Sequence, residues 1–178
     1  ALALFARDGV AATPIRTIAH EAGVSPGLVI HHFGSKDGLV AAVDEAVVKR
    51  ITTALSEVPI EGAGSELVRR RTEQIAALLK SQPSLCDYIA RALLEGSGAS
   101  ADLFSRMFAA ARRDQALLEA GAIRSDADPF WRAMLQLVLV VGPLMLRSGI
   151  ERELGRSLVE DDQFERWMAA TVDLLQHG

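Results

Sequence analysis

Two helix-start signals only ten residues apart limit the folds open to this chain more than any other feature of its sequence. Ser25 precedes Pro26, and Ser35 begins the tripeptide Ser-Lys-Asp. A serine hydroxyl accepts a hydrogen bond from the free N–H groups of a first helical turn, and proline fits the first helical position. Gly34, just before the second signal, is a typical helix stop. The spacing therefore predicts a helix of about eight residues over 26–33.

A helix this short is held by its neighbours, because an isolated helix repays its nucleation cost only over about 12 to 15 residues. The segment before it is predicted to be a second short helix, with Thr13 as cap, Pro14 at the first helical position and Gly23 as stop. Two capped helices joined by a turn of three or four residues have the spacing of a helix-turn-helix unit.

The rest of the sequence indicates an all-α protein, because apolar residues recur with a period of about 3.6 and strand signatures are absent. We expect about nine helices in two parts, a DNA-binding domain over 1–44 and a larger helical effector-binding and dimerisation domain over 45–178. The first helix has helical spacing from Leu2 without an initial methionine, so we expect further residues before Ala1. The other helices are expected near 35–58, 65–82, 84–95, 101–119, 129–147 and 161–176.

Composition narrows the class of protein. The chain has 178 residues, of which 49% are hydrophobic and one is cysteine, so it is globular and has no internal disulfide framework. The longest apolar stretch, 133–146, is shorter than the roughly 20 residues of a membrane span, and we expect a buried helix there. No signal-peptide pattern is evident, which favours a cytoplasmic protein.

The outer side of the short helix is expected to enter a DNA major groove. Its first turn carries small or flat groups, so it can approach a surface closely, and a groove about 12 Å wide admits one helix. Helix N-terminal N–H groups, hydroxyls and ammonium groups on either side can meet phosphates. The residues expected to contact DNA are Thr13, Ser25, Pro26, Gly27, Leu28, His31, His32, Ser35 and Lys36. Taken one by one, the same residues are also compatible with ordinary helix caps in an all-α protein.

The segment "TPIRTIAHEAGVSPGLVIHHFGSKDGLVAAV" resembles the DNA-binding unit of the TetR family of transcriptional regulators. The caps, the turn and the run from Phe33 to Leu39 fall in register with that family. Two positions depart from it: Leu28 replaces the usual threonine and Ile30 replaces the usual tyrosine. His32 stands at the usual phosphate-binding tyrosine. Without a hydroxyl, Leu28 favours an apolar contact such as a thymine methyl group.

The resemblance implies a homodimeric regulator, a repressor that a small-molecule effector releases from palindromic operator DNA. It implies an effector pocket among the helices of the larger part, to which we assign Tyr88, Arg91, Phe104, Met107, Phe108, Trp131 and Met134. Methionine and aromatic residues at helical spacing also fit an ordinary core. We favour a dimer interface over internal core for two apolar helices and assign to it Leu137, Val141, Leu144, Phe164, Trp167, Met168, Thr171, Leu174 and Leu175.

An enzyme is not expected. The residue four positions after His20 is Val24, so the zinc-protease pattern is incomplete, and no nucleophile elbow or phosphate-binding glycine loop is present. We therefore expect no cofactor and no metal. The competing interpretation is a helical protein–protein interaction module with a vestigial DNA-binding unit. Its support is the charge of residues 1–50, which carry five basic and five acidic side chains.

Overall fold

Ten helices, and no strand, make up the part of the chain that the computed structural model describes, namely residues 1–61, 64–95, 101–121 and 128–177. They are α1 (Leu2–Asp8), α2 (Ile15–Glu21), α3 (Pro26–Phe33), α4 (Lys36–Ser56), α5 (Gly64–Ser81), α6 (Pro83–Glu95), α7 (Ala101–Gly121), α8 (Pro129–Met145), α9 (Arg147–Leu154) and α10 (Asp161–His177). The all-α prediction is confirmed. Helix α9 is not predicted by the sequence pattern, since its residues fall at the end of the helix expected near 129–147 and in the stretch beyond it.

Helix α3 has the predicted bounds. The Ser25 hydroxyl accepts a hydrogen bond from the Leu28 N–H at 3.1 Å, and Pro26 occupies the first helical position. At the other end Gly34 has a φ of 75°, a backbone conformation in which a side chain would be strained. Both ends are therefore fixed by the residues that predicted them.

The start of α4 lies close against the end of α3. The Ser35 hydroxyl accepts a hydrogen bond from the Gly38 N–H at 3.0 Å. A Cβ atom at Gly38 would lie 2.0 Å from the carbonyl oxygen of Phe33, far inside contact distance. Glycine at this position allows the first turn of α4 to pack against the last turn of α3.

The start of α2 differs from the prediction. Thr13 does not cap the helix; its side chain is buried, and its hydroxyl donates to the Gly9 carbonyl at 2.7 Å. The helix begins at Ile15, and the carbonyl of Pro14 accepts the first hydrogen bond from the Thr17 N–H. The Thr13 hydroxyl therefore makes a hydrogen bond inside the α1–α2 loop instead of the predicted one to the first turn of α2.

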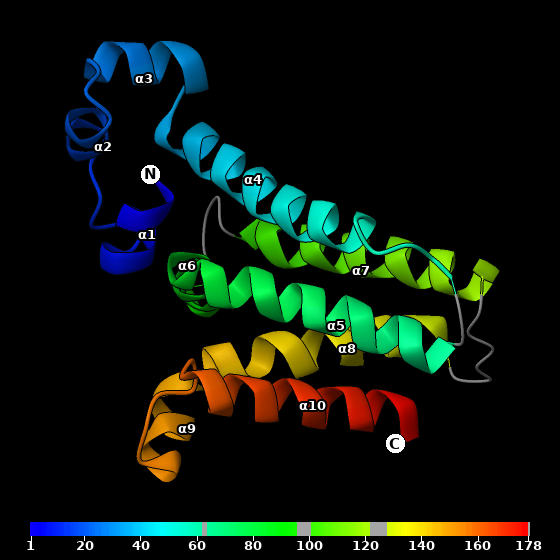
Figure 1. Cartoon of the computed structure of the whole chain (residues 1–178). Coiled ribbons are helices and arrows are strands. Elements are labelled where there is room, and N and C mark those ends of the chain that lie inside the picture. The colour runs from blue at the N-terminus through cyan, green and yellow to red at the C-terminus, as the bar shows by residue number, and fades with distance from the viewer. Residues whose placement is uncertain (62–63, 96–100, 122–127, 178) are drawn as a thin grey trace.

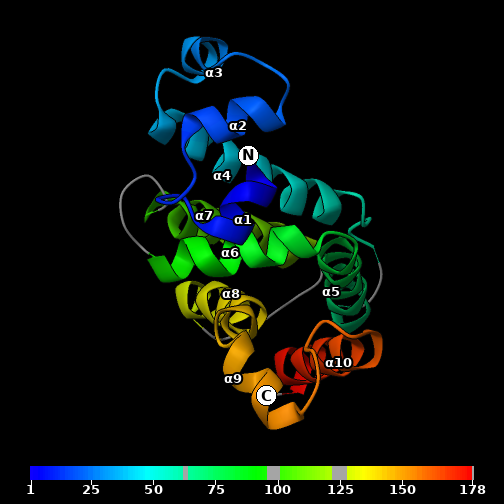
Figure 2. The ribbon, with the colours of Figure 1, turned by 90° about the vertical axis from the view of Figure 1, so that its left-hand side faces the viewer.

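Helix α4 joins the two parts of the molecule. It runs without a break through the predicted boundary between residues 44 and 45, contacting α3 at its start and α5 and α7 further along. Figures 1 and 2 both show α3 at one end of the molecule and α9 and α10 at the other. Any change in the tilt of α4 would therefore be passed to α3.

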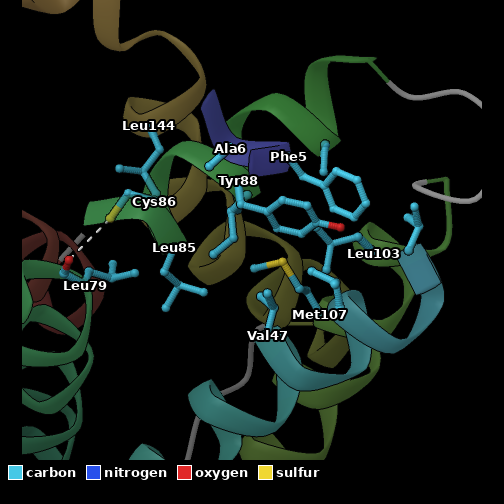
Figure 3. Close-up of a cluster of buried hydrophobic side chains, with 14 of the residues drawn as sticks. Phe5, Ala6, Val47, Leu79, Leu85, Cys86, Tyr88, Leu103, Met107 and Leu144 are labelled. Carbon is cyan, nitrogen blue, oxygen red and sulfur yellow. Dashed lines mark hydrogen bonds between the residues drawn. The ribbon is translucent and has the colours of Figure 1, made fainter. Parts of the chain in front are cut away.

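One hydrophobic core spans both parts. Helix α1 packs on α6, and Figure 3 shows the Tyr88 ring of α6 near Phe5 of α1 and near Leu103 and Met107 of α7. The Phe5 and Tyr88 ring centroids are 6.4 Å apart. Because these side chains are buried together, the first helix is held by the larger part as well as by its own neighbours.

Helices α8 and α9 meet at a sharp bend. Their axes differ by 68°, and Leu146 lies between them. No single helix of the described ranges is long and apolar enough to cross a membrane, although α8 and α9 taken together reach the required length and composition. Four residues of α8 are buried against the rest of the molecule, namely Ala133, Leu137, Val141 and Leu144.

Candidate nucleic-acid interface and ligand cavity

The outer face of α3 is open to solvent along its length. Val29 points into the core and is 6% exposed, whereas Leu28 is 52% exposed. The other residues of α3 that were predicted to contact DNA are also exposed, namely Pro26, Gly27, His31 and His32. Ser25, which precedes the helix, is exposed as well. The structure thus brings these predicted residues together on one free surface at the end of the molecule.

The predicted DNA-contacting residues outside α3 differ in their exposure to solvent. Ser35 is exposed, although its hydroxyl already accepts from Gly38. Lys36 is half-buried, and its ammonium donates to the Ala11 carbonyl at 3.3 Å, which ties α4 to the α1–α2 loop. Thr13 is 1% exposed, so the prediction that its side chain meets a phosphate is wrong.

A cavity of about 110 Å³ lies in the larger part, enclosed by α4, α5, α6, α7, α8 and α10. Apolar side chains dominate its lining. Helix α4 contributes Val48, Ile51 and Leu55, and the polar residues of the lining are Arg71, Thr72, Asp114 and Gln136. The helix that reaches the candidate DNA face therefore also forms a wall of the cavity.

An ion pair lies at this cavity. The Arg71 Nη2 of α5 donates to the Asp114 Oδ1 of α7, and the side chains are only 7% and 8% exposed. Burial lowers the pKa of the Arg71 guanidinium. The sequence gives no signal for this pair, because both residues look like ordinary charged positions on amphipathic helices 43 positions apart.

The predicted pocket residues lie mostly elsewhere. Met107 lines the cavity, but Tyr88 is directed away to Asp44, and Arg91 donates to the carbonyls of α1. Met134 is half-buried outside the lining. The other three form an aromatic cluster between α7 and α8, in which Phe130 stands between Phe108 and Trp131, and Phe104 stacks on Phe108. These six residues do not line this cavity, and their assignment to the effector pocket stays a prediction.

The predicted interface residues are largely used inside the protomer. Leu137, Val141, Leu144 and Met168 line the cavity, and Phe164 and Thr171 are buried. Trp167 is half-buried, and its Nε1 donates to the Leu139 carbonyl at 3.4 Å. Leu174 is 56% exposed, as a contact with a partner requires, and the side chain of Leu175 lies outside the described residues.

The free apolar surface lies on the opposite side of α8. Trp131, Leu135 and Val138 are spaced for one face and are 60%, 55% and 48% exposed, and Leu146 just beyond the helix is 65% exposed. We call these four residues the outer stripe of α8. Patches of this kind mark interaction surfaces in soluble proteins.

A hydrogen bond between two buried side chains links α4 to α6. The Tyr88 hydroxyl donates to the Asp44 Oδ1 at 2.6 Å, and both side chains are at most 1% exposed. Burial raises the pKa of Asp44 and also that of Tyr88. Ile89, the neighbour of Tyr88, lines the cavity, so the same stretch of α6 contacts both the cavity and α4.

Comparison with protein families decides the class. The family model described as "Bacterial regulatory proteins, tetR family" matches residues 1–43. A second, described as "Tetracyclin repressor-like, C-terminal domain", matches residues 81–178, more than half of the chain.

The chain belongs to the TetR family.

Curated relatives agree with this membership of the TetR family, whose members are transcriptional regulators and not enzymes. The chain is 30% identical over 148 residues to the "HTH-type transcriptional regulatory protein RaaS" of Mycobacterium tuberculosis, covering 82% of this chain and 66% of that protein. It is 43% identical over 81 residues to the "HTH-type transcriptional repressor Rv3405c" of the same organism, covering 45% of this chain and 43% of the repressor. The chain thus spans about two thirds of the first of these relatives and less than half of the second.

Solved structures share the TetR fold over nearly the whole chain. A transcriptional regulator from Rhodococcus sp. Rha1 has a TM-score of 0.76 at 23% identity, covering 98% of this chain and 90% of that one. FadR from Bacillus subtilis, solved in complex with stearoyl-CoA, has a TM-score of 0.75 at 14% identity, covering 99% and 94%. At these identities the likeness concerns the fold alone.

Proposed function

We propose that this TetR-family chain is a homodimeric repressor that binds operator DNA through residues 1–44 and is released when a small molecule enters the cavity of residues 45–178. The observation that carries the proposal is the free outer face of α3, which is capped at both ends and stands at the end of the molecule opposite α9 and α10. A helix held in this way can enter a major groove without rearrangement of the fold. One of the curated relatives is named a transcriptional repressor, which supports repression over activation.

Release of DNA is proposed to pass through α4 and α6. A ligand in the cavity touches the C-terminal half of α4 at Val48, Ile51 and Leu55, while the start of the same helix packs against α3. Two recognition helices must match half-sites about 34 to 36 Å apart, so a small tilt of each α4 weakens binding. The Tyr88–Asp44 hydrogen bond gives α6 a second hold on α4.

The proposed dimer surface consists of the outer stripe of α8 and of Leu174 of α10, which is 56% exposed. These large apolar side chains are about half exposed. Covering them with a second copy of the chain would stabilise the dimer by roughly 25 cal/mol for each Å² of apolar surface removed from water. A two-fold interface presents the same patch on both subunits and places two copies of α3 on one palindromic site.

Selection of bound sequences from random double-stranded DNA tests the DNA-binding function. We expect enrichment of a palindrome with two half-sites one helical turn apart. Leu28→Ala should fold and should relax the preference at one base pair per half-site by roughly 1 kcal/mol, because it removes an apolar base contact. Leu154→Ala, which truncates an exposed leucine on α9, should leave the preference unchanged. Absence of any enriched sequence would contradict the proposal.

A further inference from the structure

The cavity combines an apolar lining with one buried pair of charges. Among the described residues, Arg71 and Asp114 are the ionisable side chains that line it, and Thr72 and Gln136 are its uncharged polar residues. The methionines of the lining are Met107 and Met168. A ligand that fits this cavity therefore buries mainly carbon and meets charge at a single place.

The Arg71 guanidinium has an unused donor there. Its Nη2 is engaged by Asp114, but its Nε is buried and has no hydrogen-bond acceptor among the described residues. A buried donor without a partner costs about 1 to 3 kcal/mol. An oxygen atom of a bound ligand next to Nε would recover that cost.

The charge of the pair selects against ionised ligands. Arg71 and Asp114 together carry no net charge, and no other ionisable side chain lines the described cavity. A ligand carboxylate next to Arg71 Nε would bring a second negative charge beside the buried Asp114, and a ligand ammonium next to Asp114 would bring a second positive charge beside Arg71, so either ligand would leave one buried charge uncompensated. Leaving one member of a buried pair without its partner is strongly unfavourable. A neutral acceptor disturbs neither charge.

We infer that the effector is an uncharged, mainly apolar molecule with one oxygen acceptor, such as a ketone or ester carbonyl, that accepts a hydrogen bond from Arg71 Nε. The inference rests on the proposed function, because it names the class of ligand that the cavity takes. It gives the ion pair a role in specificity: the pair offers one hydrogen bond and rejects charged analogues.

Methionine methyl groups can report on the cavity. The chain has four methionines, and two of them, Met107 and Met168, line the cavity whereas Met134 and Met145 do not. With the full chain labelled at the ¹³C-methyl of methionine, titration with 2-octanone should shift the Met107 and Met168 resonances and leave those of Met134 and Met145 in place. Octanoate, which has the same number of carbons and is ionised at neutral pH, should bind at least tenfold more weakly.

A paired substitution tests the role of the ion pair. Arg71→Met alone would leave Asp114 buried and unpaired, so the variant is Arg71→Met with Asp114→Leu, which replaces the pair by apolar groups and is expected to fold. Loss of one hydrogen bond to a charged donor should weaken 2-octanone about tenfold, which corresponds to 1.4 kcal/mol. Its Met107 and Met168 shifts should still appear at higher ketone concentration.

Three results would overturn the inference: octanoate binding more tightly than 2-octanone, unchanged ketone affinity in the paired variant, or no shift of Met107 and Met168 with either probe. Operator binding measured on the same sample separates this from the proposed function. If the protein binds its selected DNA but does not bind the ketone, the proposed regulator function stands and the inferred ligand class is refuted. A protein that selects no DNA loses the proposed function whatever the probes do.

Discussion

The ionisation of Asp44 is linked to the fold because its side chain is buried. Its carboxyl group is fully buried; Oδ1 accepts the Tyr88 hydroxyl, and Oδ2 has no partner among the described residues. Burial is the largest influence and raises its pKa, outweighing the hydrogen bond from Tyr88. The native state therefore holds the proton more tightly than the unfolded chain does.

The sign of the resulting pH dependence follows from linkage. A raised native pKa adds stability that is fully present below the unfolded value of about 3.9 and is lost as the pH rises through the native value. Urea unfolding at a series of pH values from 4 to 7 should therefore show the wild type losing stability relative to Asp44→Asn as the pH rises. Asp37→Asn, at an exposed aspartate of the same helix, should leave the wild-type pH dependence in place. Parallel curves for wild type and Asp44→Asn would refute this account.

At the scale of single residues, local signals were the most reliable guide. Ser25 and Gly34 predicted both ends of α3 because each acts on backbone groups within four positions of itself. Thr13 carried the same kind of signal and was misassigned, since its hydroxyl is taken by Gly9 in the interior. Arg91 gave no signal of its role, because its acceptors are about 85 positions away in the sequence.

At the scale of elements, the attachment of α1 to α6 is the link between the DNA-binding part and the cavity part that the sequence did not predict. The last carbonyls of a helix lack partners within it, and a cation near that end also favours the helix dipole. Arg91 supplies both: Nε donates to the Ala6 carbonyl at 3.1 Å and Nη2 to the Arg7 carbonyl at 3.2 Å. A single side chain of α6 thus holds the C-terminal end of α1.

Removing that side chain should loosen α1 locally. We expect Arg91→Leu to lower the free energy of opening of α1 by about 1 kcal/mol, which is roughly a fivefold faster exchange of its amide hydrogens. Hydrogen exchange followed by mass spectrometry on α1 peptides measures this. Arg152→Leu, at an exposed arginine of α9, serves as the control and should leave α1 unchanged. Equal exchange in both variants would mean that apolar packing alone holds α1.

The sequence could identify α8 as apolar but could not orient it. Between Met134 and Met145 this helix is apolar apart from Gln136, so its periodicity does not distinguish a face that packs inside the protomer from one that is free. The assigned interface residues Leu137 and Val141 consequently lie in the cavity wall, whereas Leu135 and Val138 are exposed. Only the placement of α6, α7 and α10 around α8 decides between the two faces.

At the scale of the whole molecule, the outer stripe of α8 predicts a dimer that one exposed substitution should break. Val138→Arg should leave the protomer folded, since the side chain is 48% exposed, and should yield a monomer because a charge would be buried at the two-fold interface without a partner. Analytical ultracentrifugation measures the mass. Leu94→Arg, at a 61% exposed leucine of α6, should remain dimeric. An intact Val138→Arg dimer would place the interface elsewhere.

During synthesis of the protein, the contact between α1 and α6 can form only after α6 has been translated. Helix α1 is made before α6, and the arginine that holds its end is 85 positions further along. At 5 to 20 residues per second, the ribosome needs about 4 to 17 s to cover that distance. During this time Phe5 has no Tyr88 to pack against. The nascent α1 therefore reaches its partner only after α2, α3, α4 and α5 have been translated, when the turn between α2 and α3 has had time to form.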